Sequence, residues 1–168
     1  HGITTSYDYV DGVVSTVTSH FVEGSQHTFR RILYTYDSND WVEKITQQFY
    51  VGTNSAPGVG DFVNQKRLSL EIATSTFVGK YKSGDLHKVH VQIPDGSGWT
   101  TTQSQLMIYY TTGNDAGFLR AVLKEKAYGS FSNIDSATVA QLEAKADSVF
   151  EYDSDYRVSK ITDQCSGA

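Results

Sequence analysis

One pattern occurs three times in this chain and constrains how its backbone can fold. An aromatic strand end leads into a turn rich in Asp, Asn and Ser, and the outgoing strand then closes on a β-branched residue and Thr. The pattern occupies residues 7–18, 36–46 and 152–162. Short polar side chains bond nearby backbone amides at turns, so each stretch predicts a hairpin. Consecutive hairpins of this kind predict an antiparallel meander.

Between these hairpins, apolar and polar residues alternate as they do in half-buried strands. Further strands are expected over 27–37, 41–51, 64–78, 86–93, 99–112 and 118–127. The alanine-rich residues 135–149 carry an apolar stripe at helical spacing and predict a helix. We therefore predict an all-β fold, an antiparallel meander of about 8–10 strands forming a barrel or a sandwich, with one helix near the C-terminus.

The length of 168 residues predicts a single β domain, 1–168. Within it, Tyr7 and Tyr36 are separated by the same number of residues as Tyr81 and Tyr110. This equal spacing predicts two related four-strand units, about 1–74 and 75–128, followed by the helix and a final hairpin.

Charge and composition exclude several classes of partner. The net charge of −5 argues against nucleic-acid binding, which depends on clustered Lys and Arg. No apolar run approaches the roughly 20 residues that cross a bilayer, so no membrane span is expected. The single cysteine, Cys165, predicts a disulfide-free protein without a cysteine metal site. These features fit a soluble protein, secreted or cytoplasmic, and the start at His1 fits a processed terminus or a tag remnant.

The Tyr-x-Tyr-Asp segments resemble the YD repeats of Rhs-type and teneurin-type shells, whose units continue with a glycine-containing turn and then Arg-Leu or Arg-Val. Segments 34–37 and 150–153 match best. The first is Tyr-Thr-Tyr-Asp, and the second is Phe-Glu-Tyr-Asp, with Phe in place of the first Tyr. The family's glycine is absent from both turns, where Asp40-Trp41 and Tyr156-Arg157 stand. The resemblance implies strand-turn-strand geometry and no particular activity.

Aromatic residues beside Asp and Asn turns have the composition that a sugar site needs. Sugars present apolar C–H faces that stack on aromatic rings, and hydroxyls that bond carboxylates and amides. Several such turns in one frame would gain affinity through avidity. The predicted ligand-binding residues are Asp37, Asn39, Asp40, Trp41, Asp95, Trp99, Asp153, Asp155 and Tyr156. The alternative is that the polar residues only form the turns and the aromatic residues cap the core.

No metal and no cofactor is predicted. The acidic turns lack the glycine bend and closing Glu of a calcium loop. An N-terminal His1 can chelate copper, as in lytic polysaccharide monooxygenases, but no second-ligand motif accompanies it. If Glu23 and Gly24 form a two-residue turn, His20 and His27 stand opposite each other, as an exposed cross-strand pair or as a metal-binding pair. His87 and His90 are expected to point to opposite faces of one strand.

The sequence contains no nucleophile elbow, P-loop, dinucleotide fingerprint or HExxH motif, so no catalytic residue is assigned. We therefore expect a non-enzymatic, lectin-like protein that binds glycans at its hairpin turns. Three alternatives stay open. One is a barrel that encloses a small hydrophobic ligand. Another is a structural module whose aromatic sheet face buries against a partner or a second copy, giving a homo-oligomer. The third is an enzyme.

Overall fold

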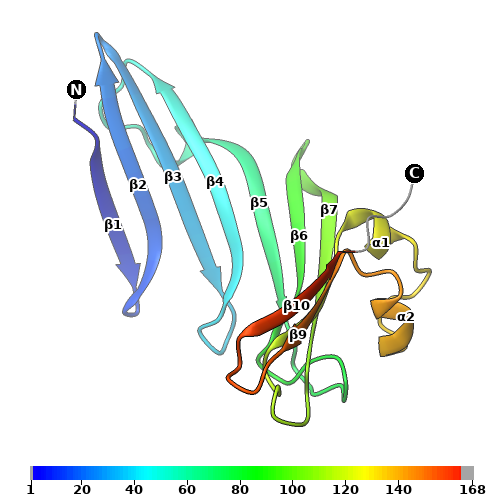
Figure 1. Ribbon diagram of the computed structural model, residues 1–168. Coiled ribbons are helices and arrows are strands. Elements are labelled where there is room, and N and C mark those ends of the chain that lie inside the picture. Colours follow the sequence, from blue (N-terminus) through cyan, green and yellow to red (C-terminus); the bar gives the residue numbers. More distant parts are fainter. Residues whose placement is uncertain (1, 164–168) are drawn as a thin grey trace. The chain divides into compact units, whose positions relative to one another are not determined.

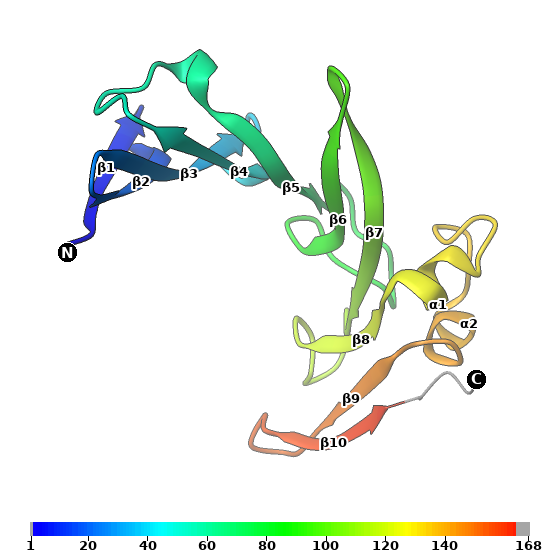
Figure 2. The same cartoon turned by 90° about the horizontal axis from the view of Figure 1, so that it is seen from above.

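The computed structural model describes residues 2–163 (Figures 1 and 2). Ten strands form one antiparallel meander, in which each strand pairs with the next one along the chain. The predicted all-β antiparallel meander is therefore confirmed. Within residues 2–163, β1 and β10 are each paired on one side only, so the sheet is not closed and the barrel alternative is wrong. Cys165, from which we predicted a disulfide-free protein, and His1, which could chelate copper, lie outside the described residues.

The strands are β1 Thr4–Val10, β2 Val13–Glu23, β3 Gln26–Tyr36, β4 Val42–Gly52, β5 Val63–Ile72, β6 Leu86–Asp95, β7 Gly98–Tyr109, β8 Leu119–Leu123, β9 Ser148–Tyr152 and β10 Val158–Asp163. The helical elements are the single 3-10 turn η1 Val59–Asp61 and the short helices α1 Glu125–Gly129 and α2 Val139–Glu143. No helix in the described part of the chain has the length and apolar character needed to cross a membrane.

The chain divides into two compact units. The N-terminal unit contains His1–Ser69 and Val91–Thr102, and the C-terminal unit contains Leu70–His90 and Gln103–Ala168. The predicted duplication of two four-strand units stays a prediction.

The N-terminal unit is built on β1 to β5 and has no fully buried side chain among the residues described in it. Its described apolar side chains are half-buried or exposed. On one face, Phe62 from the loop over 53–62 meets Phe29 and Tyr50, with ring centroids 6.4 and 6.2 Å away. Stability here rests on cross-strand pairs.

The C-terminal unit has the hydrophobic core. Strands β7 and β8 bury one face against the segment that contains α1 and α2. The core residues are Leu106, Ile108, Ala121, Leu123, Ile134, Ala137, Leu142 and Ala146. Leu142 of α2 is completely buried there.

The helix expected over 135–149 is much shorter in the structure. Only Val139–Glu143 is α-helical, and Thr138 caps it by accepting a hydrogen bond from the Gln141 backbone amide. The chain leaves the helix because β8 offers an unpaired edge. The backbone amide of Asp147 donates to the Val122 carbonyl, and strand β9 follows at once. Pairing on that edge satisfies backbone groups that would otherwise lack partners.

Two of the three similar stretches form the same turn. In both, the first Asp accepts hydrogen bonds from the backbone amides two and four residues later, at 2.8 and 3.0 Å for Asp37 and 2.9 and 3.0 Å for Asp153. Asp40 and Tyr156, which replace the glycine of YD repeats, have left-handed φ values of 61° and 62°. The turn therefore keeps the backbone conformation that glycine adopts most easily.

The first stretch, residues 7–18, forms a different turn from those at Asp37 and Asp153. Asp11 and Gly12 form a two-residue turn with φ values of 50° and 85°. Positive φ at both central residues is typical of a type I′ hairpin. Tyr9 consequently stands one residue before the end of the incoming strand and directly after its register shift, as Tyr36 stands directly after the register shift of its hairpin, and Tyr7 lies two residues earlier.

Four hairpins share one arrangement near the turn. A tyrosine of the incoming strand pairs with a Val or Leu of the outgoing strand, and the register then shifts by one residue. The pairs are Tyr9 with Val14, Tyr36 with Val42, Tyr109 with Leu119 and Tyr152 with Val158. Three of these tyrosines also bond a carbonyl of the preceding outgoing strand, Tyr36 to Val14 at 2.7 Å, Tyr109 to Leu86 at 2.7 Å and Tyr152 to Leu119 at 2.8 Å. We call these three bonds the tyrosine clasps.

Candidate functional site

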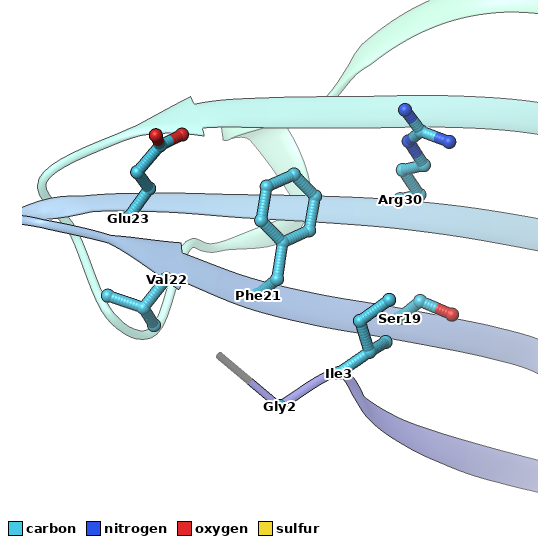
Figure 3. A pocket seen from close by; sticks show the side chains of 7 residues that line it. All are labelled: Gly2, Ile3, Ser19, Phe21, Val22, Glu23 and Arg30. Atoms are coloured by element: carbon cyan, nitrogen blue, oxygen red, sulfur yellow. The ribbon is translucent and has the colours of Figure 1, made fainter.

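A hollow of about 560 Å³ lies on one face of β2 and β3, beside the start of β1 (Figure 3). This volume lies within the range of small-molecule sites. The lining residues are Gly2, Ile3, Ser19, Phe21, Val22, Glu23 and Arg30. We call it the Phe21 hollow.

Strand alternation and register place the polar groups around the ring. Ser19, Phe21 and Glu23 occupy alternate positions of β2 and share one face. Ser19 pairs with Arg30 of β3, which brings the guanidinium to the same side. Figure 3 shows the Phe21 ring between the Glu23 carboxylate and the Arg30 guanidinium, all three projecting from the same side of the two strands.

Both charged groups of the Phe21 hollow are available to a ligand. Within residues 2–163, neither Glu23 nor Arg30 has an ion-pair or side-chain hydrogen-bond partner. The Ser19 hydroxyl makes one long contact, 3.4 Å from the Thr5 hydroxyl. A carboxylate only accepts hydrogen bonds and a guanidinium only donates them. The hollow therefore offers an acceptor and a donor on either side of an apolar ring.

A second cleft lies on the opposite face of the same strands, under the loop over 53–62. Its volume is about 420 Å³. Its lining includes the Asp8 carboxylate and the Thr16 and Thr18 hydroxyls, with Phe29 and Phe62 as aromatic wall. We call it the loop cleft.

The cation of the loop cleft is already engaged. Arg31 lies 3.8 Å from the Phe62 ring centroid, and its Nε and Nη2 both donate to Gln48 Oε1, at 3.0 and 2.6 Å. Burial lowers the pKa of Arg31, and the nearby Asp8 carboxylate opposes that change. The guanidinium thus has less freedom to meet a ligand than Arg30 has.

His20 and His27 stack near Phe29 of this cleft, with ring centroids 4.0 and 6.4 Å from it, but do not pair as predicted. The register places His20 opposite Phe29 and His27 opposite Val22, because the turn centres on Gly24 and Ser25. The two rings nevertheless meet diagonally, with His20 Nε2 3.0 Å from His27 Nδ1. Among residues 2–163, no three His, Cys, Asp or Glu side chains are grouped so that they could hold a metal ion.

The nine predicted ligand residues lie in three separate hairpins. Asp37, Asn39, Asp40 and Trp41 form one turn, Asp95 and Trp99 belong to the β6–β7 hairpin, and Asp153, Asp155 and Tyr156 form a third turn. The acidic groups mostly serve the turns. Hydrogen bonds from the Asn39 and Trp41 amides lower the pKa of Asp37, and those from the Arg157 and Asp155 amides lower the pKa of Asp153.

The predicted aromatic residues reach solvent to different degrees. Trp41 is 39% exposed and Tyr156 is 53% exposed. Trp99 carries the guanidinium of Arg67 4.4 Å from its ring centroid, and Tyr156 stacks on Phe118 at 5.7 Å. Glycan contact at these turns stays a prediction, because two of the three rings and the first Asp of each turn also have a structural contact.

The C-terminal unit contains a buried polar network that the sequence did not reveal. Lys88 is 9% exposed, and its Nζ lies 3.1 Å from each carboxylate oxygen of Asp135 and 3.4 Å from Glu71. Burial lowers the pKa of Lys88, but the hydrogen bond to Asp135 and the charge of Glu71 outweigh it, so the pKa is raised. A buried cation needs such partners.

The histidine prediction for this strand was wrong. His87 and His90 both face Glu71, with Nε2 atoms 3.9 and 3.0 Å from its carboxylate. His87 lies at the start of β6, where its ring packs on Tyr81 at 4.5 Å. His90 also contacts the Ser104 hydroxyl, at 2.9 Å.

This network ties strands together and fixes the loop before α2. Lys88 holds Asp135 to the sheet, and the Lys80 ammonium donates to the Asp135 carbonyl at 2.6 Å. Burial, followed by the charge of Lys88, lowers the pKa of His87, so the ring is favoured in its neutral form. We assign the network a structural role, because its charged groups satisfy one another.

Comparison with known proteins identifies no family. No family model matches the chain, and no curated protein matches it. A crystal structure of a Bacteroides fragilis protein of unknown function is similar at 9% sequence identity, with 98% of this chain and 93% of that chain covered and a TM-score of 0.41.

Proposed function

We propose that the protein binds carbohydrate and that the Phe21 hollow is its binding site. One observation carries the proposal: an aromatic ring stands between a carboxylate and a guanidinium that have no partner within residues 2–163. A pyranose ring places its apolar C–H face on the aromatic ring and its equatorial hydroxyls on either side. Glu23 accepts hydrogen bonds from hydroxyls, and Arg30 donates to hydroxyl or ring oxygens.

The size of the hollow limits the ligand. A volume of about 560 Å³ accommodates one or two sugar units. The hollow is open to solvent along the sheet face, so we propose recognition of a short exposed segment of a longer glycan. The three predicted turn sites would then act as additional weak contacts.

A glycan array of the purified protein tests this function. We expect binding to a small group of glycans that share a terminal or internal unit. We expect the same binding with Ca²⁺ and with a chelator, since the contacts proposed are direct. Uniform absence of binding across the array, at protein concentrations above those of weak lectin sites, would refute carbohydrate recognition.

Substitutions in the hollow test the site. Glu23→Gln and Arg30→Gln each remove one charge with little change of shape. Hydrogen bonds to charged groups contribute about 1.5–3 kcal/mol, so each change should weaken glycan binding about 10- to 100-fold. Isothermal titration calorimetry with the best array ligand measures the loss. Thermal unfolding should be unchanged, because neither side chain contributes an ion pair.

Matched variants separate the hollow from other surfaces. Lys66→Gln removes an exposed charge from β5 of the same sheet and should leave binding unchanged. Trp41→Ala and Trp99→Ala address the turn sites. If these two variants abolish binding while Arg30→Gln does not, the ligand binds at the turns and the assignment to the Phe21 hollow is wrong.

A further inference from the structure

Within residues 2–163, the tyrosine clasps form a series that is incomplete at both ends of the sheet. In each clasp, a tyrosine next to a register shift donates to a carbonyl of the outgoing strand that precedes it in the meander. Val14 and Leu119, two of the three acceptors, are also the residues that pair with the tyrosine of their own hairpin. Donor and acceptor positions therefore recur together from hairpin to hairpin.

Tyr9 occupies the donor position without an acceptor. It pairs with Val14 beside a register shift, as Tyr36 pairs with Val42. No strand precedes β1 in residues 2–163, and β1 forms one edge of the sheet (Figure 1). Tyr9 is 62% exposed and its hydroxyl has no hydrogen-bond partner among the described residues.

Val158 occupies the acceptor position, and no residue in 2–163 donates to its carbonyl from the outer side of β10. It pairs with Tyr152 beside a register shift, as Val14 pairs with Tyr9. Strand β10 forms the other edge of the sheet, and every residue of it is exposed. By analogy with Val14 and Leu119, the carbonyl of Val158 faces the unpaired side of β10.

We propose that β10 of one molecule pairs antiparallel with β1 of a second copy, and that Tyr9 of that copy donates its hydroxyl to the Val158 carbonyl. The contact repeats between molecules the step that joins β2 to β3 and β8 to β9 within one chain. It is heterologous, since two different edges meet, so assembly proceeds head to tail. Unpaired edge strands are ready templates for such pairing.

The internal clasps also set the register of this contact. In the β2–β3 pair, Thr16 stands opposite Leu33. Continuation of this register places Val14 opposite Thr35, the residue before Tyr36. The same relation places Val158 opposite Asp8 of the second copy.

Two further pairs follow along the strands, with Lys160 opposite Ser6 and Thr162 opposite Thr4. Asp8 is the one charged residue of β1, and it lies diagonally from Lys160. Opposite charges at such cross-strand positions stabilise pairing.

Sedimentation velocity over a concentration series tests the proposal. We expect the wild-type protein to self-associate, with species larger than a dimer at high concentration. Tyr9→Phe removes only the hydroxyl and should weaken association about three- to tenfold, the effect of one hydrogen bond. Tyr7→Phe is the matched control, because that tyrosine lies on the same strand outside the clasp position, and it should leave association unchanged.

A charge exchange tests the register. Ser6→Lys places like charges opposite each other and should weaken association about two- to fivefold. Adding Lys160→Glu to Ser6→Lys should restore most of it. A wild-type protein that stays monomeric at its highest soluble concentration refutes the proposal. So does equal behaviour of Tyr7→Phe and Tyr9→Phe, or association that Ser6→Lys leaves unaffected. Far-UV circular dichroism establishes that each variant is folded.

Discussion

Replacing Tyr109 by Phe tests whether the tyrosine clasps hold consecutive hairpins together. The Tyr109 hydroxyl lies 2.7 Å from the Leu86 carbonyl, and burial raises the pKa of this tyrosine, with the charge of Asp85 adding to the effect. A typical hydrogen bond contributes about 0.5–1.5 kcal/mol net, and a carbonyl left without its partner adds to the cost. We therefore expect Tyr109→Phe to lower the free energy of unfolding by about 1–2 kcal/mol.

Thermal unfolding and urea titration measure this loss. For a chain of this length, about 1–2 kcal/mol corresponds to a fall in Tm of about 2–8 °C. Tyr9→Phe is the matched control, because the Tyr9 hydroxyl has no acceptor within residues 2–163. In dilute protein its stability should stay within about 0.5 kcal/mol of wild type. Equal losses in Tyr9→Phe and Tyr109→Phe, or no loss in Tyr109→Phe, would show that the clasps do not stabilise the meander.

Four other changes follow from the structure. Leu142→Ala opens a cavity at a completely buried position, so urea titration should show a loss of about 2–5 kcal/mol, and a loss below about 1 kcal/mol would contradict the assigned core. Asp40→Gly should be more stable than Asp40→Ala by about 1 kcal/mol in thermal unfolding, because φ is 61° at this residue, and the reverse order would exclude backbone strain as the cause. Lowering of the Asp37 pKa, by the Asn39 amide first, means that the ionised carboxylate stabilises the fold. That contribution is complete above the unfolded pKa of about 3.9 and is lost as the pH falls through the folded pKa, so the dependence of Tm on pH in acid should be flatter in Asp37→Asn. Lys88→Met should change stability by less than about 1 kcal/mol, since its half-exposed carboxylate partners can hydrate, whereas a loss of about 3 kcal/mol or more would mean that the ion pairs themselves hold the network together.

Local sequence signals predicted the hairpins well because turn chemistry is local. The Asp37 and Asp153 turns follow from side chains that bond amides only two and four residues away. The first hairpin was aligned wrongly because residues 7–8 are Tyr-Asp, the same dipeptide that begins the other two stretches. The Asp11-Gly12 pair was the stronger signal, since it is a favoured two-residue turn and places Tyr9 next to last in the incoming strand.

Features that depend on long-range pairing could not be predicted. Residues 135–149 have good helix formers, but the free edge of β8 captures the chain at Asp147, and strand pairing ends the helix early. The Phe21 hollow depends on the register between β2 and β3, which places Arg30 beside Ser19. A turn centred one residue earlier would have given Arg30 another neighbour. Sequence patterns alone do not distinguish these registers.

The described part of the N-terminal unit has no fully buried side chain. This property supports both glycan binding at the Phe21 hollow and pairing of the β1 edge with a second copy. If a second layer of structure packed on a sheet face, the side chains of that face would be inaccessible. Only loops and backbone edges would then be open to a ligand. Here Phe21, on the β2 face, is open because nothing in residues 2–69 or 91–102 covers that face completely. The same arrangement leaves β1 with little packing energy of its own, since all its residues are exposed. Pairing with a further strand would stabilise β1 through its backbone groups, and it would leave the Phe21 ring on the sheet face uncovered. Glycan binding and head-to-tail association are therefore compatible, and Arg30→Gln and Tyr9→Phe should each impair one without the other.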